Sequence, residues 1–393
     1  MPRPIKIATA KTDAALADEA RALLSQLEAE MNVFAHERQT EIGAMLDCAV
    51  AGEHMLMIGD PGIAKSMLAD MFADAFEETP FSAQLTKTMV PKDLFGEFDI
   101  QAYEKGEQRH MIEGMLPTAK VAILDELYKA NPALLNSLLR IILERKHLNG
   151  STVVDCPLRF MLATSNGLPE AGDPILEAFA DRILVKFLVE RIQNQEAVDG
   201  LLWGPEPSRP WTKITFEHLD ALQRVAKKIG ASAEVRAAML AIRATLHDKG
   251  IKVSDRRWKK AAGYLRAHVA RRGGSEVTLA DLEPLENILW NRPEDRPAVR
   301  AAVREHLATW RDDARQIRAQ LEEQRTRVRG AKKIREIGAI QDSLDSEISP
   351  ALDGLRTVSA DAAEEAELLG AILSDIEIEI SNRFRSKKKA TRF

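Results

Sequence analysis

The sequence predicts an α/β fold with a parallel sheet, followed by an all-helical part. In the first half of the chain, short apolar runs alternate with segments of helical length, which is typical of a parallel sheet covered on both faces. From Lys213 onward the pattern is helical alone. The five predicted strands are HMLMI (54–58), FSAQL (81–85), VAILD (121–125), RFMLATS (159–165) and RILVKFLV (182–189).

Two helices are expected before the first strand. Residues 13–32 place apolar side chains three and four positions apart, as on one face of an amphipathic helix, and a second helix is expected over 37–51. After the last strand, WGPEPSRPW (203–211) has three prolines and a glycine, and we interpret it as a hinge. In the helical part, Thr278 and Asp281 have the spacing of a helix start.

The final segment, 312–393, is expected to form a helical hairpin. It carries two narrow apolar stripes on charged sequence, and Ser349-Pro350 between them fits an N-cap followed by a proline at the first helical position. The hairpin is too short in heptads to be a sustained coiled coil. The tail RFRSKKKATRF is basic and is expected to be disordered. The stripes are Ile334, Ile337, Leu344 and Ile348, and Leu369, Ile372, Leu373, Ile376 and Ile380.

Composition excludes several classes of protein. The 393 residues have a net charge of -5, so the chain as a whole has no electrostatic reason to bind nucleic acid or anionic lipid. Cys48 and Cys156 are too few for a disulfide framework, and no H-E-x-x-H zinc motif occurs. No apolar run approaches the ~18 residues of a membrane span, and no signal peptide is recognisable. These features predict a cytoplasmic protein without a membrane span.

A phosphate-loop pattern follows the first predicted strand. GDPGIAKS (59–66) matches G-x-x-x-x-G-K-[ST] except at Ala64, where glycine is usual. Such a loop points backbone N–H groups into one concavity at a helix N-terminus, and its lysine, here Lys65, adds a mobile charge for the terminal phosphates. Ala64 keeps its N–H, and its methyl group costs about 1–2 kcal/mol only if the residue is left-handed. The alternative is an ordinary glycine turn before a helix.

Polar residues end two further predicted strands. In VAILDE (121–126), Asp125 is expected to hold Mg²⁺ together with Ser66, and Glu126 to activate the attacking water. An acidic helix cap is the alternative, although Asn131-Pro132 is a better cap for the helix that follows. Asn166, after RFMLATS, can hold the same water by hydrogen bonds, or can simply form a turn.

Taken together, these motifs resemble the AAA+ ATPases of the helix-2-insert clade, and within them the MoxR family, most closely its RavA-like branch. The likeness covers about residues 30–310, and the loop form G-x-P-G-x-A-K-S is itself typical of the RavA-like branch. The matching segments are FAHERQTEIGAMLDCAVAGEH, GDPGIAKS, MVPKDLFGEFDIQAYEKG, GMLPTAKVAILDELYKANPALLNSLLRIILERK, ATSNGLPEA, LEAFADR and VSDRRWKKA.

The resemblance implies an ATP site with bound Mg²⁺. Lys65 and Ser66 then belong to Walker A, Asp125 and Glu126 to Walker B, and Asn166 is sensor 1. Ala35 stands where the family usually has glycine, which would alter backbone contacts to adenine. The residues expected to bind nucleotide are Val33, Phe34, His36, Gly59, Asp60, Pro61, Gly62, Ile63, Ala64, Lys65, Ser66 and Met67.

The same resemblance assigns two arginines and a domain order. Arg182 matches the arginine finger toward a neighbouring subunit, and Arg256 matches sensor 2, a role that Arg257 could take instead. Arg182 and Arg256 could each also form an ordinary surface ion pair. A finger in trans implies a closed homo-oligomer, expected to be a hexameric ring. The expected domains are an N-terminal helical segment (1–32), an AAA+ core (33–205), a helical lid (206–311) and the helical hairpin (312–393).

Three functions are compatible with these residues. The first is a ring ATPase that remodels or matures an unknown client protein with a von Willebrand factor A domain partner, which is often present in this family. The second is a chelatase-like motor for metal or cofactor insertion. The third is a nucleotide-dependent scaffold with little turnover, against which Glu126, Asn166 and Arg182 argue. Residues 91–116, between the second strand and Walker B, resemble the insertion of the clade and are expected to form a hairpin that faces the ring axis.

Overall fold

The computed structural model describes residues 12–167, 179, 181–204, 212–307, 310–331, 334–356 and 360–390. The chain divides into two compact units, Met1–Val303 and Arg304–Phe393. Among the described residues no helix is both long and apolar enough to cross a bilayer. The domain boundaries expected at 32, 205 and 311 stay predictions.

The first unit is built on the predicted parallel sheet. All five apolar runs form strands, in the spatial order β2-β3-β6-β1-β7. In the register, Ile58 lies beside Ser165, and Leu124 lies beside Ala163, so the carboxyl ends of β1, β3 and β6 meet at one edge. The α/β fold class is thereby confirmed. The strands are β1 Met55–Ile58, β2 Phe81–Gln84, β3 Val121–Asp125, β6 Phe160–Ser165 and β7 Val185–Leu188.

Helices cover this sheet because their apolar faces match its buried strands. Helix α2 contacts β6 and β7, and α3 contacts β3 and β6. Helix α6 begins as expected, since the Asn131 side chain accepts a hydrogen bond from the backbone of Leu134 and Pro132 occupies the first turn. Outside residues 91–115, the helices before β6 are α1 Asp13–Phe34, α2 Gln39–Ala51, α3 Lys65–Asp74, η1 Leu116–Thr118, η2 Leu127–Lys129 and α6 Pro132–Glu144.

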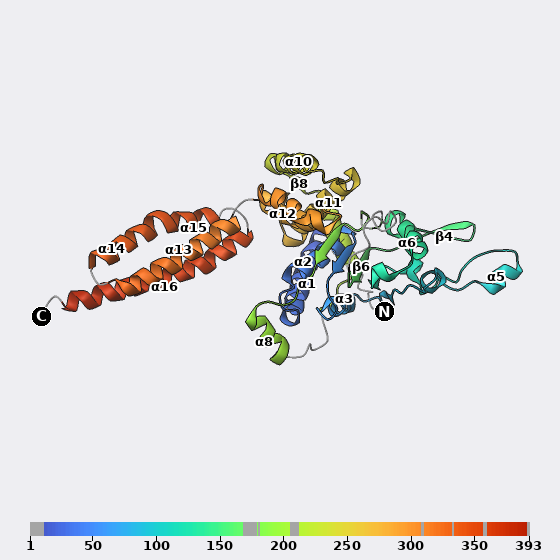
Figure 1. Ribbon diagram of the computed structural model, residues 1–393, viewed down its shortest axis with the longest axis horizontal. Helices are drawn as coiled ribbons and strands as arrows, with labels where there is room; N and C mark the ends of the chain where they lie inside the picture. The colour runs from blue at the N-terminus through green and yellow to red at the C-terminus, as the bar shows by residue number, and fades with distance from the viewer. Residues whose placement is uncertain are drawn as a thin grey trace, which may run out of the picture. The chain divides into compact units, whose positions relative to one another are not determined.

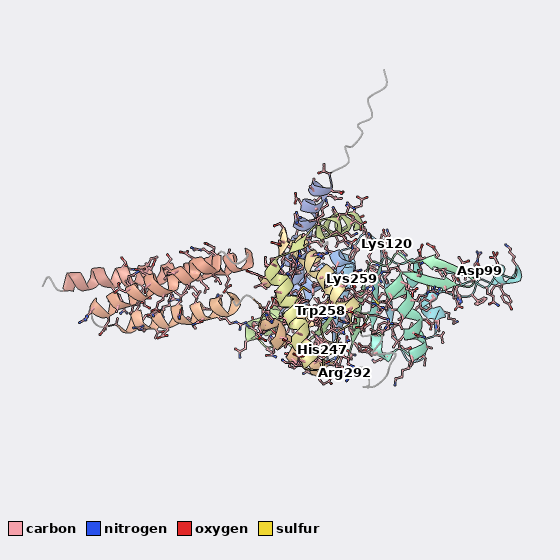
Figure 2. All side chains as sticks on the ribbon, turned by 90° about the horizontal axis from the view of Figure 1, so that it is seen from above. Asp99, Lys120, His247, Trp258, Lys259 and Arg292 are labelled. Atoms are coloured by element: carbon pink, nitrogen blue, oxygen red, sulfur yellow. The ribbon has the colours of Figure 1, made fainter. Side chains whose placement is uncertain are left out.

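Residues 91–116, here called the arm, project beside the hairpin of β4 and β5 (Figure 1). The arm contains two short helices, α4 Lys92–Phe95 and α5 Ile100–Glu104, and one antiparallel bridge between Phe98 and His110 joins its two limbs. Asp99 caps α5 near the far end of the arm (Figure 2). The antiparallel hairpin of β4 Lys146–Asn149 and β5 Thr152–Asp155 was not predicted.

A helical lid completes the first unit, and α1 and α2 pack against it. Helix α1 contacts α9, and α2 contacts α11. Thr278 and Asp281 form the predicted capping box, although the helix that they start is a 3₁₀ helix. The elements between β7 and the end of the first unit are α8 Gln195–Trp203, α9 Phe216–Ala226, β8 Gly230–Ala231, α10 Ala233–Asp248, α11 Asp255–Arg272, β9 Glu276–Val277, η3 Leu279–Asn287, η4 Pro293–Asp295 and α12 Arg296–Arg304.

A buried ionic cluster joins α2 of the core to α11 of the lid. The Asp47 carboxylate accepts hydrogen bonds from Arg271 Nε at 2.6 Å and pairs with His268 Nδ1 at 2.7 Å. Arg271 also donates to Glu28 of α1 at 2.6 Å. Burial would raise the pKa of Asp47, but the charges of Arg271 and His268 outweigh burial, so that this pKa lies far below its ordinary value. Every charge in the cluster therefore has a partner.

The second unit is a bundle of three helical rods, which corrects the predicted hairpin. Residues 310–330 form an additional helix, and a π-helical turn joins α14 to α15 without a break. Ser349-Pro350 therefore continues a helix and does not start a separate one. Helix α16 also runs into the tail that was expected to be disordered, as far as Ala390. The elements are α13 Trp310–Gly330, α14 Ile334–Ser343, η5 Leu344–Ile348, α15 Ser349–Arg356 and α16 Ala360–Ala390.

Candidate functional site

The phosphate-loop pattern lies between β1 and α3, as expected. Lys65 is the first residue of α3, and its Nζ donates to the carbonyl oxygens of Gly59 at 2.7 Å and Asp60 at 2.6 Å. Gly59 is needed because a Cβ there would lie 2.5 Å from the Val189 carbonyl oxygen. The loop thus has the close backbone approach and the helix N-terminus that a phosphate cradle requires.

Ala64 adopts the left-handed conformation, with φ of 71° and ψ of 12°. The methyl group that replaces the usual glycine hydrogen therefore costs about 1–2 kcal/mol. Glu37, Glu126 and Arg145 are the other non-glycine residues with positive φ in the described part of the chain. Ala64 lies in the phosphate loop, Glu37 directly follows the segment expected to contact adenine, and Glu126 is the expected base. Such backbone strain is typical of functional sites.

Asp125 and Ser66 come together across the sheet edge. Ser66 Oγ lies 3.4 Å from Asp125 Oδ2, and the other carboxylate oxygen accepts hydrogen bonds from Thr164 Oγ1 and from the Glu126 backbone N–H. One hydroxyl and one carboxylate oxygen are ligands that Mg²⁺ prefers, and it takes its remaining ligands from water and phosphate. Among the described residues there is no cluster of three or more His, Cys, Asp or Glu side chains for another kind of metal.

Glu126 and Asn166 form a second pair beside the first. The Asn166 side-chain amide donates to Glu126 Oε1, and its Oδ1 accepts from Lys65 Nζ at 3.0 Å. Lys129 Nζ lies 3.1 Å from the same Glu126 oxygen. The Glu126 side chain is only 7% exposed. One amide therefore connects the loop lysine to the carboxylate that is expected to activate water.

Burial and charge act in opposite directions on Lys65. Burial lowers its pKa, while the carboxylates of Glu126, Asp125 and Asp60 raise it, and burial prevails. The lysine therefore gains from any additional negative charge that approaches it. A phosphate group bound in the loop would supply that charge.

The segment expected to contact adenine lies at the end of α1 and packs against α8. Val33 is exposed, and Phe34 and His36 are half-buried. The His36 ring approaches Gly200 of α8 so closely that a Cβ there would lie 2.6 Å from its Cε1. The Glu37 carboxylate accepts hydrogen bonds from the backbone N–H groups of Gln193 and Asn194 before α8, which lowers the pKa of Glu37. Helix α8 and the adenine segment are thus held together.

Of the two lid arginines that could be sensor 2, one is buried and one is exposed. Arg257 is 1% exposed, and its guanidinium donates to the carbonyl oxygens of Ile183, Leu184 and Ile288 at 2.7–3.1 Å. It therefore supports the fold and has no surface to offer a phosphate. Arg256 is exposed on the first turn of α11. The geometry favours Arg256, whose role stays a prediction.

Arg182 precedes β7 and is half-buried, in a turn where its backbone N–H bonds to the Phe179 carbonyl oxygen at 2.9 Å. Residues 168–178 and 180, which include most of LEAFADR and part of ATSNGLPEA, lie outside the described residues. Its role as a finger toward a neighbouring subunit stays a prediction. Of the remaining loop residues, Ile63 is buried, and Pro61 and Met67 are exposed.

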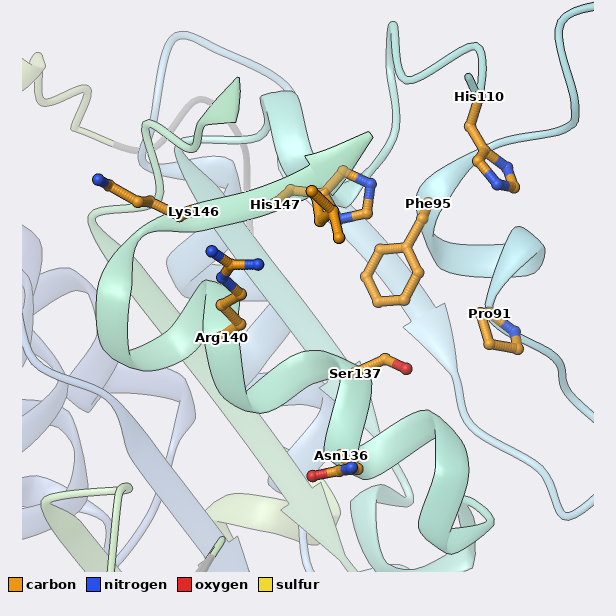
Figure 3. A pocket seen from close by; sticks show the side chains of 9 residues that line it. Pro91, Phe95, His110, Asn136, Ser137, Arg140, Lys146 and His147 are labelled. Carbon is orange, nitrogen blue, oxygen red and sulfur yellow. The ribbon is translucent and has the colours of Figure 1, made fainter. Parts of the chain in front are cut away.

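A separate pocket of about 330 Å³ lies between the arm and α6 (Figure 3). No residue predicted to bind nucleotide lines it. In its wall the rings of Phe95 and His147 stack with centroids 5.0 Å apart. Burial and the nearby charges of His110 and Arg140 lower the pKa of His147. The pocket therefore belongs to the base of the arm and not to the nucleotide site.

Known proteins resemble this chain both in the part that contains the parallel sheet and in the lid. The family described as the MoxR domain in the MoxR-vWA-beta-propeller ternary systems matches residues 22–224, and an AAA lid domain matches residues 234–303. The uncharacterized protein MJ0812 of Methanocaldococcus jannaschii is 33% identical over 274 residues, which cover 70% of this chain and 73% of that protein. Chaperone MoxR1 of Mycobacterium tuberculosis is 30% identical over 138 residues, which cover 35% of this chain and 36% of that protein.

The fold recurs in a solved structure. The crystal structure of a candidate ATPase from Cytophaga hutchinsonii has a TM-score of 0.59 at 17% identity and covers 74% of this chain and 96% of that one. At this identity the likeness supports the fold, whereas the family models and the relatives carry the assignment. Membership of the RavA-like branch stays a prediction. The chain belongs to the MoxR family of AAA+ ATPases.

Proposed function

We propose that this protein hydrolyses ATP with Mg²⁺ in a closed, hexameric ring of identical subunits, and that the ring remodels or matures a client protein. The observation that carries the proposal is the convergence of Lys65, Ser66, Asp125, Glu126 and Asn166 at one sheet edge. The bound Mg²⁺ would neutralise charge on the phosphates. Ser66 and Asp125 are the residues that would hold it.

The remaining steps belong to the protein's own side chains. Lys65 would bind the terminal phosphates. Its hydrogen bonds to the carbonyl oxygens of Gly59 and Asp60 would then be replaced by hydrogen bonds to phosphate oxygens. Asn166 would orient the water, and Glu126 would accept its proton. Arg182 of a neighbouring subunit would stabilise the charge that spreads over the transferred phosphoryl group.

A von Willebrand factor A domain protein is the proposed partner. The support is the description of the matched family, which occurs in ternary systems with such a domain. The arm exposes Ile100, Tyr103 and Met111, with 71%, 58% and 55% of their surface accessible, and these apolar side chains suit contact with a protein client.

The experiment that tests the proposal mixes two inactive variants. Arg182→Ala keeps an intact nucleotide site but lacks the arginine finger. Lys65→Ala keeps the arginine finger but lacks the lysine that its own nucleotide site needs. Phosphate release should return when Arg182→Ala subunits are mixed with excess Lys65→Ala subunits, because each supplies what its neighbour lacks. Mixtures that stay inactive at every ratio would contradict a finger that acts in trans. Sedimentation of the wild-type protein with ATP gives the ring stoichiometry.

A further inference from the structure

The carboxylate of Asp181 ties the loop that carries Arg182 to the first turn of lid helix α11. Ser254 Oγ lies 3.2 Å from Asp181 Oδ1 and 3.4 Å from Oδ2, and Arg257 Nε lies 3.4 Å from Oδ1. Ser254 is the N-cap of α11 and accepts a hydrogen bond from the Arg257 backbone N–H at 3.2 Å. The hydroxyl therefore caps the helix and holds the loop with the same atom.

Electrostatics favour the ionised form of this carboxylate. Burial would raise the pKa of Asp181, but the Arg257 charge and the hydrogen bonds from Ser254, Arg257 and Asn291 outweigh burial and lower it. The contact is consequently charge-assisted, and a charge-assisted hydrogen bond is stronger than a neutral one of the same geometry. It constrains the loop more firmly than a neutral bond would.

Other bonds in this region hold β7 to the lid. Arg257 donates to the carbonyls of Ile183 and Leu184, which directly follow Arg182. Lys186 of β7 is 1% exposed, and its Nζ donates to the Trp290 carbonyl and to Asn291 Oδ1, both at 2.8 Å. The chain after Arg182 is thus fixed to the lid through its backbone, and the residue before Arg182 is fixed through a side chain. Arg182 lies between these two attachments.

The lid end of this connection carries Arg256, two residues after Ser254. If Arg256 binds nucleotide in its own subunit, the first turn of α11 would move toward that nucleotide. Ser254, the N-cap of the same helix, would move together with this turn. We propose that Asp181 is a positioning residue, which transmits this shift to Arg182 and so sets the finger for the neighbouring subunit's ATP. The inference rests on the proposed function, because it requires the finger to act in trans.

Variants of this connection should lower turnover without weakening nucleotide binding. For Asp181→Ala and for Ser254→Ala we expect kcat to fall by about 100-fold, the loss typical of a misplaced catalytic group. The Kd for a fluorescent ATP analogue should be unchanged, since Lys65 and its loop are untouched. Ser254→Thr keeps the hydroxyl and should restore kcat. Ser232→Ala removes the N-cap of another lid helix, α10, and serves as the matched control with normal kcat.

Mixing decides whether the defect lies at the neighbour's site. Asp181→Ala subunits, mixed with excess Lys65→Ala subunits, should regain phosphate release as Arg182→Ala subunits do. If only the Arg182→Ala mixture regains activity, Asp181 supports its own subunit and the inference is wrong, while the proposed function stands. If neither mixture does, the trans finger fails and the inference fails with it. Equal kcat in Ser254→Ala and Ser232→Ala would also overturn it.

Discussion

Asn166 donates a hydrogen bond from its side-chain amide to the carboxylate of Glu126. Because Asn166 Oδ1 accepts from Lys65 Nζ at the same time, the orientation of the amide is set by both partners. The carboxylate in turn lies next to Asp125, the expected metal ligand, on a residue with φ of 56°.

Glu126→Gln should abolish turnover and preserve ATP binding. The amide keeps the size of the side chain but cannot accept a proton, so we expect kcat to fall by about 100-fold or more. Single-turnover hydrolysis and equilibrium ATP titration measure the two quantities separately. Undiminished hydrolysis would remove Glu126 from the mechanism. The same variant, held with ATP, should trap the client for identification by mass spectrometry.

Ala64→Gly should stabilise the protein. Glycine relieves the left-handed strain of about 1–2 kcal/mol. Its greater conformational freedom in the unfolded chain offsets about 0.5–1 kcal/mol of this gain. The expected net gain in the free energy of unfolding is about 0.5–1 kcal/mol, measured by urea denaturation. Ala73→Gly within α3 is the matched control and should lose about 1 kcal/mol. A loss of stability in Ala64→Gly would contradict the conformation described for the loop.

His54 should make stability depend on pH. The ring is fully buried, its Nδ1 accepts from the Met161 backbone N–H at 3.0 Å, and burial holds its pKa well below the ordinary value. The unfolded chain therefore binds a proton that the folded chain does not. Stability is full above about pH 6.5 and falls by up to about 1.4 kcal/mol per pH unit below it.

Denaturant unfolding between pH 7.5 and 5.5 measures this slope. His54→Asn keeps an acceptor for Met161 and cannot titrate, so the slope should decrease in this variant. His247→Asn, at an exposed position on α10, should leave the slope as it is. An identical slope in all three proteins would mean that another group controls the pH dependence.

Asp47→Ala should destabilise the first unit strongly. The substitution leaves Arg271, which is 7% exposed, without one of its two carboxylates. It leaves His268 with only the more distant carboxylate of Asp281, at 4.0 Å. Removing one member of a buried ion pair costs about 3–5 kcal/mol. Asp18→Ala, at an exposed pair with Arg21, should stay within about 0.5 kcal/mol of the wild type in the same thermal or urea unfolding experiment.

The sheet and the ends of its strands could be predicted because burial on both faces makes a strand a continuous apolar run. For that reason VAILD and RFMLATS identified both the strands and the polar residues that follow them. The contact of Lys65 with Asn166 could not be predicted, since it joins residues 101 positions apart. Nor could the burial of Arg257 be predicted, because an arginine bound to backbone carbonyls has no pattern in sequence.

Two other differences have local causes. The hairpin of β4 and β5 turns at Gly150 and Ser151, because Asn149 pairs with Thr152 and Gly150 has a φ of 64°. A glycine followed by serine between two short strands is a signal for a two-residue hairpin turn. In the second unit, a proline after serine predicts a helix start at Pro350, but the π-helical turn directly before it accommodates the missing N–H group and lets the helix continue. Proline is a boundary signal only where no neighbouring turn compensates for it.

The arm is attached at more than its two chain ends. Asn149 of the β4–β5 hairpin accepts from the His110 backbone N–H at 2.6 Å and donates to the His110 carbonyl at 3.0 Å. At the root of the arm, the Asn131 side chain donates to the Met89 carbonyl at 2.6 Å, and Asn131 also caps α6, five residues after Glu126. The arm is therefore bound to the β4–β5 hairpin and, at its root, to the first residue position before α6, so that two hydrogen-bonded sites fix it close to the strand that ends in Asp125.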